Sequence, residues 1–192
     1  MSDADRAFWT KLAPALAAED WSTAERLLRA RAKKPRPPAA VLFNLGQVLL
    51  RSEKADQSGA WYRKALAVDP NHVAAWCELG AWSAERDDLD AAMEAFDRAL
   101  RLAPDDADAL RGLGRAALRR GDWATAETAF RRLPEEDAEA RMALYRIAAE
   151  QDAADLAERR RALATDPALR PALLKTLTRT ARGRLPLRPK DL

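Results

Sequence analysis

VAAWCELGAWSAERDDLDAAMEAFDRALRLAPDD, residues 73–106, is a stretch of 34 residues whose pattern recurs along the chain. Its Leu-Gly pair is found again 34 residues earlier and 34 residues later, at Leu45–Gly46, Leu79–Gly80 and Leu113–Gly114. An aromatic residue follows each glycine at the same interval, as Tyr62, Phe96 and Phe130. Three copies in register indicate a repeat array.

Each copy contains two apolar stripes at helical spacing, one around the glycine and one around the later aromatic residue. The glycine predicts a close approach of two helices, and the aromatic side chain is expected to fill the gap between neighbouring units. A proline, such as Pro104, ends the second helix, and the adjoining aspartates suit turns and helix N-caps. Because one hairpin cannot bury its own apolar face, the hairpins are expected to stack.

A unit of this length that reads aromatic-x-x-Leu-Gly, then Ala-x-x-x-Phe, then Pro resembles the tetratricopeptide repeat (TPR). The resemblance implies an all-α fold, a right-handed α-solenoid of stacked helical hairpins. We expect about three clear TPR-like units, degenerate units at both ends and a C-terminal capping helix. The predicted repeat domain covers residues 1–183, with units at about 8–38, 39–72, 73–106, 107–134 and 135–167 and a cap at 168–182. Pro14 is expected to interrupt the first helix, and residues 184–192 form a basic, Pro-containing tail.

Composition favours a globular, helical and cytoplasmic protein. Hydrophobic residues make up 48% and charged residues 33% of the 192 residues, which is globular rather than disordered. The start of the sequence lacks the pattern of a signal peptide, and no apolar run is long enough to span a bilayer. The net charge of +3 is concentrated at the C-terminal end, where seven Arg or Lys residues and one Asp follow residue 167.

The sequence contains no pattern that predicts an enzyme, a cofactor site or a metal site. The one histidine, His72, is interpreted as a solvated residue of a turn. The one cysteine, Cys77, has no second cysteine or histidine at metal-ligand spacing. The acidic runs fall at helix starts and turns, where carboxylates favour capping over acid-base chemistry. We therefore expect no catalytic, cofactor-binding or metal-binding residues.

The TPR resemblance implies a groove lined by the first helix of each unit, which binds a segment of a partner protein. Arg111, Arg115 and Arg119 lie four residues apart on one helix face, and apolar or small side chains adjoin them. This pattern fits a segment with an aliphatic anchor and an acidic group, although a solvated face of arginines is the alternative. The predicted groove residues are Phe43, Asn44, Gln47, Leu50, Arg51, Cys77, Ala81, Arg111, Arg115, Leu118 and Arg119.

A subclass of TPR proteins binds a partner's C-terminal carboxylate through Lys and Asn residues. Asn44 matches one of those asparagines, but Ala74 and Glu78 stand where basic residues are expected, so this subclass is disfavoured. Among the six tryptophans, Trp21, Trp76 and Trp123 fall in apolar columns and are expected in the core. Trp61 and Trp82 replace small residues, so each is either core or an exposed anchor for a partner.

The predicted function is a non-enzymatic scaffold, adaptor or assembly factor that binds another protein in the groove. The alternative is a docking or regulatory domain of an associated or fused enzyme. A third hypothesis, less favoured because no nucleic-acid motif supports it, is a polyanion binder that acts through the basic tail. No small-molecule substrate and no membrane insertion are expected.

Overall fold

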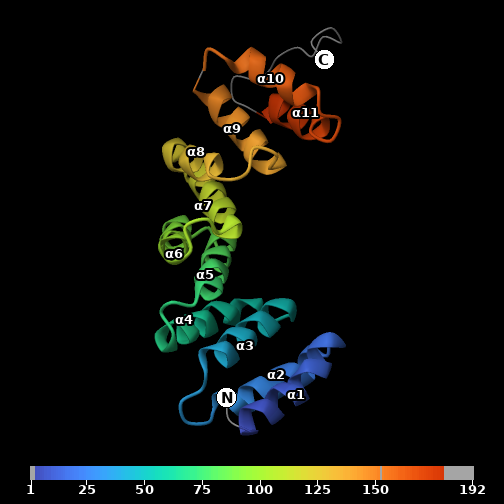
Figure 1. Cartoon of the computed structure of the whole chain (residues 1–192), viewed down its shortest axis with the longest axis vertical. Helices are drawn as coiled ribbons and strands as arrows, with labels where there is room; N and C mark the ends of the chain where they lie inside the picture. Colours follow the sequence, from blue (N-terminus) through green and yellow to red (C-terminus); the bar gives the residue numbers. More distant parts are fainter. Residues whose placement is uncertain (1–2, 152, 180–192) are drawn as a thin grey trace. The chain divides into compact units, whose positions relative to one another are not determined.

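The computed structural model describes residues 3–151 and 153–179, and within them every regular element is a helix (Figure 1). The predicted all-α repeat fold is therefore confirmed. No helix among the described residues is long and apolar enough to cross a membrane. The chain divides into two compact units, residues 1–104 and 105–192. The predicted tail at 184–192, and the last residues of the predicted cap, lie outside the described residues.

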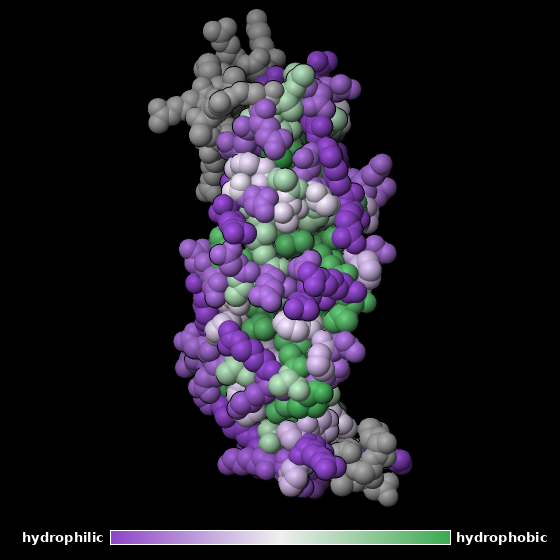
Figure 2. All heavy atoms as spheres, turned by 90° about the vertical axis from the view of Figure 1, so that its left-hand side faces the viewer, coloured by the Kyte–Doolittle hydropathy of each residue, from purple (hydrophilic) through white to green (hydrophobic). Residues whose placement is uncertain are grey.

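Unit 1 consists of three helical hairpins in which each helix packs on the next. The helices are α1 (Asp3–Ala17), α2 (Trp21–Ala32), α3 (Ala39–Arg51), α4 (Ser58–Val68), α5 (Val73–Glu85) and α6 (Leu89–Leu102), with a short 3-10 helix, η1 (Ala55–Gln57), before α4. Two clusters of buried side chains hold them together, one shared by α1, α2 and α3 and one shared by α3, α4, α5 and α6. Polar side chains cover most of the face seen in Figure 2.

Unit 2 contains α7 (Ala107–Arg120), α8 (Trp123–Arg131), α9 (Ala138–Glu150), α10 (Leu156–Ala164) and α11 (Arg170–Arg179). Here α11 packs on both α9 and α10. Leu169, Leu173 and Leu177 are buried against Tyr145 of α9 and Leu163 of α10. These leucines form the apolar face that the last helix buries.

In each of the hairpins α3–α4, α5–α6 and α7–α8, an aromatic ring of the second helix lies directly on a glycine of the first helix. A Cβ atom built on Gly46 would lie 2.5 Å from Cε1 of Tyr62, and one on Gly114 would lie 2.6 Å from Cε2 of Phe130. Gly80 of α5 and Phe96 of α6 form the same pair. The ring therefore fills space inside its own hairpin, whereas the sequence pattern predicted that it fills the gap between units. Tyr62 does both, since it also packs in a cluster with Leu79 of α5.

Aspartates start most of these helices, as the sequence predicted. The side chains of Asp20, Asp88, Asp106, Asp122 and Asp137 each accept a hydrogen bond from the backbone N–H three residues on. These bonds satisfy donors that the first turn of a helix leaves without partners. Acceptance of these backbone bonds also lowers the pKa of Asp20, Asp122 and Asp137, because it stabilises the charged form.

Two local features differ from expectation. Pro14 does not interrupt the first helix, since α1 continues from Asp3 to Ala17 with Pro14 on its exposed side. In addition, Glu25 is a nearly buried carboxylate in α2, bound by Arg29 at 2.7 Å and by Lys54 at 2.8 Å. The hydrogen bond from Lys54 and that from Arg29 outweigh the burial and lower the pKa of Glu25. This ion pair ties the first hairpin to the segment that precedes α4.

Candidate partner-binding groove

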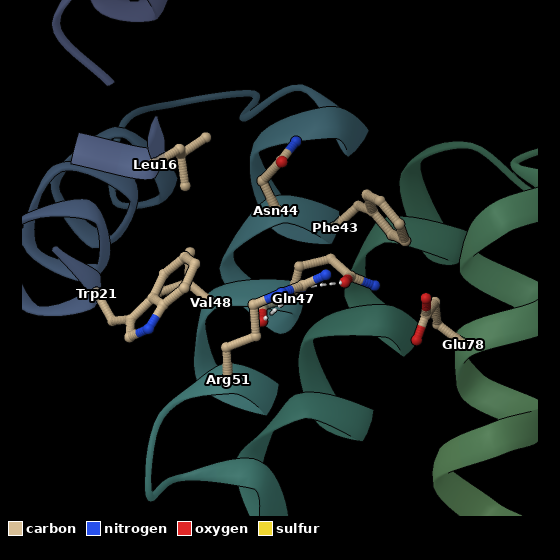
Figure 3. Close-up of a pocket in the computed structure, with 8 residues that line it drawn as sticks. All are labelled: Leu16, Trp21, Phe43, Asn44, Gln47, Val48, Arg51 and Glu78. Carbon is tan, nitrogen blue, oxygen red and sulfur yellow. Dashed lines mark hydrogen bonds between the residues drawn. The ribbon is translucent and has the colours of Figure 1, made fainter. Parts of the chain in front are cut away.

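An open cleft of about 330 Å³ lies in unit 1 between the first hairpin, α3 and α5 (Figure 3). Most of its wall comes from α3, because residues four apart on a helix lie on one face. The cleft is lined by Leu16, Trp21, Phe43, Asn44, Gln47, Val48, Arg51 and Glu78. Four of the predicted groove residues, namely Phe43, Asn44, Gln47 and Arg51, are thus brought together.

The wall of the cleft combines apolar surface with groups that can hydrogen-bond. In Figure 3, Trp21 lies beside Val48 at one end, and Phe43 lies toward Glu78 at the other. Between them, Arg51 donates a hydrogen bond of 2.7 Å to the side-chain oxygen of Gln47. The ring of Phe43 is held from behind by Tyr62, with centroids 5.9 Å apart, and by His72, at 4.8 Å. A bound segment would therefore meet a supported aromatic wall and a polar strip.

Gln47 is fixed from a second side, since its amide nitrogen donates to the hydroxyl of Tyr62 at 3.3 Å. Tyr62 is fully buried, and this burial raises the pKa of its hydroxyl. The hydroxyl therefore stays neutral, and the buried core positions a polar group of the cleft. Asn44 is less constrained by tertiary contacts, because its amide donates to the carbonyl of Ala40 one turn earlier in the same helix.

The other predicted groove residues of unit 1 do not line the cleft. Leu50 is 41% exposed, which is high for a large apolar side chain, and Ala81 is exposed on α5. Cys77 is half-buried and reduced. A contact between these three residues and a partner therefore stays a prediction.

In unit 2 the predicted arginines have carboxylate partners, which the helix pattern alone did not show. Arg111 donates to Asp137 at 2.8 Å and to Asp108 at 3.2 Å, while Arg115 donates through two nitrogens to Glu139. These hydrogen bonds raise the pKa of both guanidinium groups. An acidic partner would have to displace these carboxylates, so the arginine face is less available than the sequence suggested. The third arginine, Arg119, and the half-buried Leu118 lie further along α7.

Trp61 and Trp82 are both partly buried rather than free anchors. Trp82 lies on the backbone of Gly59, and its ring nitrogen donates to the carbonyl of Ala55 at 3.0 Å. A Cβ atom on Gly59 would be 2.6 Å from the indole, so this glycine makes room for the ring. Trp61 packs against both core clusters of unit 1.

Four further residues differ from their predicted roles. His72 is half-buried and caps α5 by accepting a hydrogen bond from the backbone N–H of Ala75, so it is not a freely solvated turn residue. Trp21, Trp76 and Trp123, predicted in the core, are only partly buried. Trp21 borders the cleft, and Trp76 donates to the carbonyl of Pro70 at 2.8 Å.

The sequence analysis missed four residues that line the cleft: Leu16, Trp21, Val48 and Glu78. The sequence contained a partial signal for Trp21, because its repeat column holds Ala55 and Leu89 as well as Trp123, so a large ring is not required there. Leu16 was hidden by the expectation that Pro14 breaks its helix. Once α1 is continuous, Leu16 reaches the wall of the groove.

The helices form pairs that recur every 34 residues, and the first helices of these pairs supply most of the cleft. These features define an α-helical repeat protein of the class that binds other proteins. Two family models, both described as tetratricopeptide repeat, match residues 15–73 and 83–150, which together are well over half of the chain. The chain belongs to the tetratricopeptide repeat family. Arrays of this kind are typically non-enzymatic protein–protein interaction scaffolds, and a protein partner follows from that membership.

Solved structures with the same fold include MamA and a tetratricopeptide repeat protein from Parabacteroides merdae. A MamA crystal structure matches with a TM-score of 0.73 at 19% identity, over 98% of this chain and 100% of that one. The P. merdae protein matches with a TM-score of 0.76 at 20% identity, over 95% and 77% of the two chains. At these identities the likeness establishes the fold.

A curated relative is the protein CTR9 homolog of Arabidopsis thaliana. It is 31% identical over 90 residues, which are 47% of this chain and 8% of the relative. The chain thus corresponds to a small part of that protein.

Proposed function

We propose that the chain is a scaffold or adaptor that binds an extended segment of a partner protein in the cleft of unit 1. The observation that supports this most directly is the composition of the cleft, where a supported aromatic and aliphatic wall adjoins amide and guanidinium groups. Ligand sites in proteins combine apolar surface with a small number of placed polar groups in this way. The segment would place an aliphatic or aromatic side chain between Trp21 and Phe43.

The polar strip would bind the backbone of that segment. The side chains of Asn44, Gln47 and Arg51 follow one another along α3 at intervals of three and four residues. Asn44 and Gln47 can both donate to and accept from successive peptide groups of an extended chain, and Arg51 can donate to them. Such contacts tolerate sequence variation, so the apolar anchor would supply most of the specificity.

The arginines of α7, in unit 2, would form a separate and weaker contact site for an acidic group. The side chain of Arg115 is 60% exposed, and exposed ion pairs contribute only about 0–1 kcal/mol. An acidic group of the partner could therefore exchange with Glu139 at little cost. The expected dissociation constant is on the order of micromolar.

A peptide-display selection on the wild-type protein tests the proposal. Selected peptides are measured against Asn44→Arg, which places a long side chain in the cleft, and against Glu94→Arg, which places the same side chain on the exposed surface of α6. We expect Asn44→Arg to weaken binding at least tenfold and Glu94→Arg to leave it within twofold. Equal affinities for the three proteins would move the site away from the cleft.

A further inference from the structure

Unit 1 also has a positively charged surface, which shares no residue with the cleft. Two tryptophans, Trp61 of α4 and Trp82 of α5, are each covered by two cationic side chains. Nζ of Lys64 lies 3.9 Å from the ring centroid of Trp61, and Cζ of Arg86 lies 4.0 Å from that of Trp82. Arg29 and Arg63 complete the set at 5.7 and 5.1 Å. We call these six residues the tryptophan–cation strip.

Four of the six strip residues lie in a strongly basic stretch of the sequence, whereas Trp82 and Arg86 lie beyond it. Residues 26–64 contain ten Lys or Arg residues and two acidic ones. Lys54 of this stretch adjoins the strip, because it binds Glu25, which also binds Arg29. Unit 1 as a whole is balanced in charge, with equal numbers of acidic and basic residues over positions 1–104. The excess of positive charge is therefore local.

The carboxylates that adjoin the strip do not neutralise it. Glu25 binds Arg29 and Lys54, and Asp56 binds Arg86. Within the described residues no carboxylate pairs with Arg63 or Lys64, and both are exposed. Cations close to one another repel, so their retention on one surface favours an anionic partner that offsets the repulsion.

The arrangement of the rings favours a polypeptide with carboxylates over a single-stranded nucleic acid as the anionic partner. Proteins that bind single-stranded nucleic acid stack bases on open aromatic faces. Here the indole of Trp82 lies between the backbone of Gly59 and the side chain of Arg86, and Lys64 covers Trp61. A guanidinium that lies over a ring keeps its N–H edge available for a carboxylate. The rings thus hold the cations in place, and each ring already carries a cationic side chain where a base would stack.

We propose that the tryptophan–cation strip binds an acidic polypeptide segment, rich in Asp and Glu, of a partner protein. The carboxylates would contact Arg63 and Lys64 first, because neither has a carboxylate partner to displace among the residues that the structure describes. The surface is distinct from the cleft, so one partner can use both or two partners can bind together. Binding through solvent-exposed charges weakens with added salt.

Fluorescence anisotropy with labelled poly-L-glutamate of about twenty residues tests this proposal. We expect Arg63→Glu/Lys64→Glu to weaken binding at least tenfold at low salt. The matched control is Arg98→Glu/Arg101→Glu, which makes the same change of charge on α6 and should alter binding less than threefold. An equal loss in both proteins would show that only net charge matters and would overturn the proposal, as would no loss in the first.

Further measurements keep the result interpretable. Arg63→Gln/Lys64→Gln removes the charges without reversing them, and it should weaken binding about threefold if the first variant is too unstable to assay. Asn44→Arg should bind poly-L-glutamate as the wild type does, which separates the strip from the cleft. An oligothymidylate of twenty nucleotides, or vesicles containing phosphatidylserine, that bound more tightly than poly-L-glutamate at the same salt would contradict the choice of a polypeptide.

Discussion

Substitution of Gly46 by alanine tests the close packing inside the second hairpin. The added Cβ would lie 2.5 Å from Cε1 and 2.7 Å from Cδ1 of Tyr62. Carbon atoms in contact prefer separations of about 3.5–4.0 Å, so the ring or the helix has to move by about 1 Å. Tyr62 is 0% exposed and its hydroxyl is engaged by Gln47, which leaves the ring little freedom to yield.

Two opposing contributions set the size of the change in the free energy of unfolding. Overpacking of a well-packed core costs about 1–3 kcal/mol, and the full burial of the ring places this site near the upper end. Alanine is favoured over glycine in a helix interior by about 1 kcal/mol. We therefore expect Gly46→Ala to lower the free energy of unfolding by about 2 kcal/mol, whereas helix propensity alone predicts an increase.

Urea unfolding, followed by far-ultraviolet circular dichroism, measures this change in a double-mutant cycle. In a Tyr62→Leu background the flexible leucine can rotate away, and the same Gly46→Ala change should become neutral or stabilising. Ala81→Gly, at an exposed position of α5, measures the propensity term by itself and should cost about 1 kcal/mol. Stabilisation by Gly46→Ala in the wild-type background, or an equal cost in both backgrounds, would refute the packing argument.

Four other substitutions probe separate features. Ser58→Ala should stabilise the protein by about 1 kcal/mol in thermal melts, because the buried Ser58 hydroxyl has no hydrogen-bond partner among the described residues. Glu25→Gln should be less stable than the wild type near neutral pH. Because the folded-state pKa of Glu25 lies below its ordinary value of 4.5, that difference should shrink as the pH falls below 4.5 and through the folded-state pKa. Asp137→Ala should cost about 1–2 kcal/mol in urea unfolding, since a helix cap is lost. Arg115→Glu should weaken the contact with Glu139, and the swap Arg115→Glu/Glu139→Arg should restore the melting temperature.

The fold could be predicted from the sequence because its determinants are local and repeat. The interval of 34 residues identified the glycines and the aromatic rings, and the aspartates marked the helix starts. The partner of each ring could not be deduced in the same way. An aromatic side chain at Phe96 can fill a gap on either side of its helix, and only the position of Gly80 in space decides between them.

The site was predicted less completely, because it depends on contacts between repeats. The spacing of Arg111 and Arg115 shows that they share a face, but their partners Asp137 and Glu139 lie more than twenty residues away. Likewise, Trp82 stands in a repeat column otherwise held by smaller residues, which left both a core role and an exposed anchor open. The matching Gly59 in α4, which accommodates the ring, falls outside the repeat pattern.

The ring-on-glycine contact also bears on the order of events in folding. Gly46 and Tyr62, Gly80 and Phe96, and Gly114 and Phe130 are each separated by only sixteen residues. Contacts at short sequence separation close small loops, and proteins rich in them fold rapidly. A hairpin of this kind can form as soon as both of its helices have left the ribosome, before the next repeat has been synthesised. Each completed hairpin then presents a formed surface on which the following one can assemble.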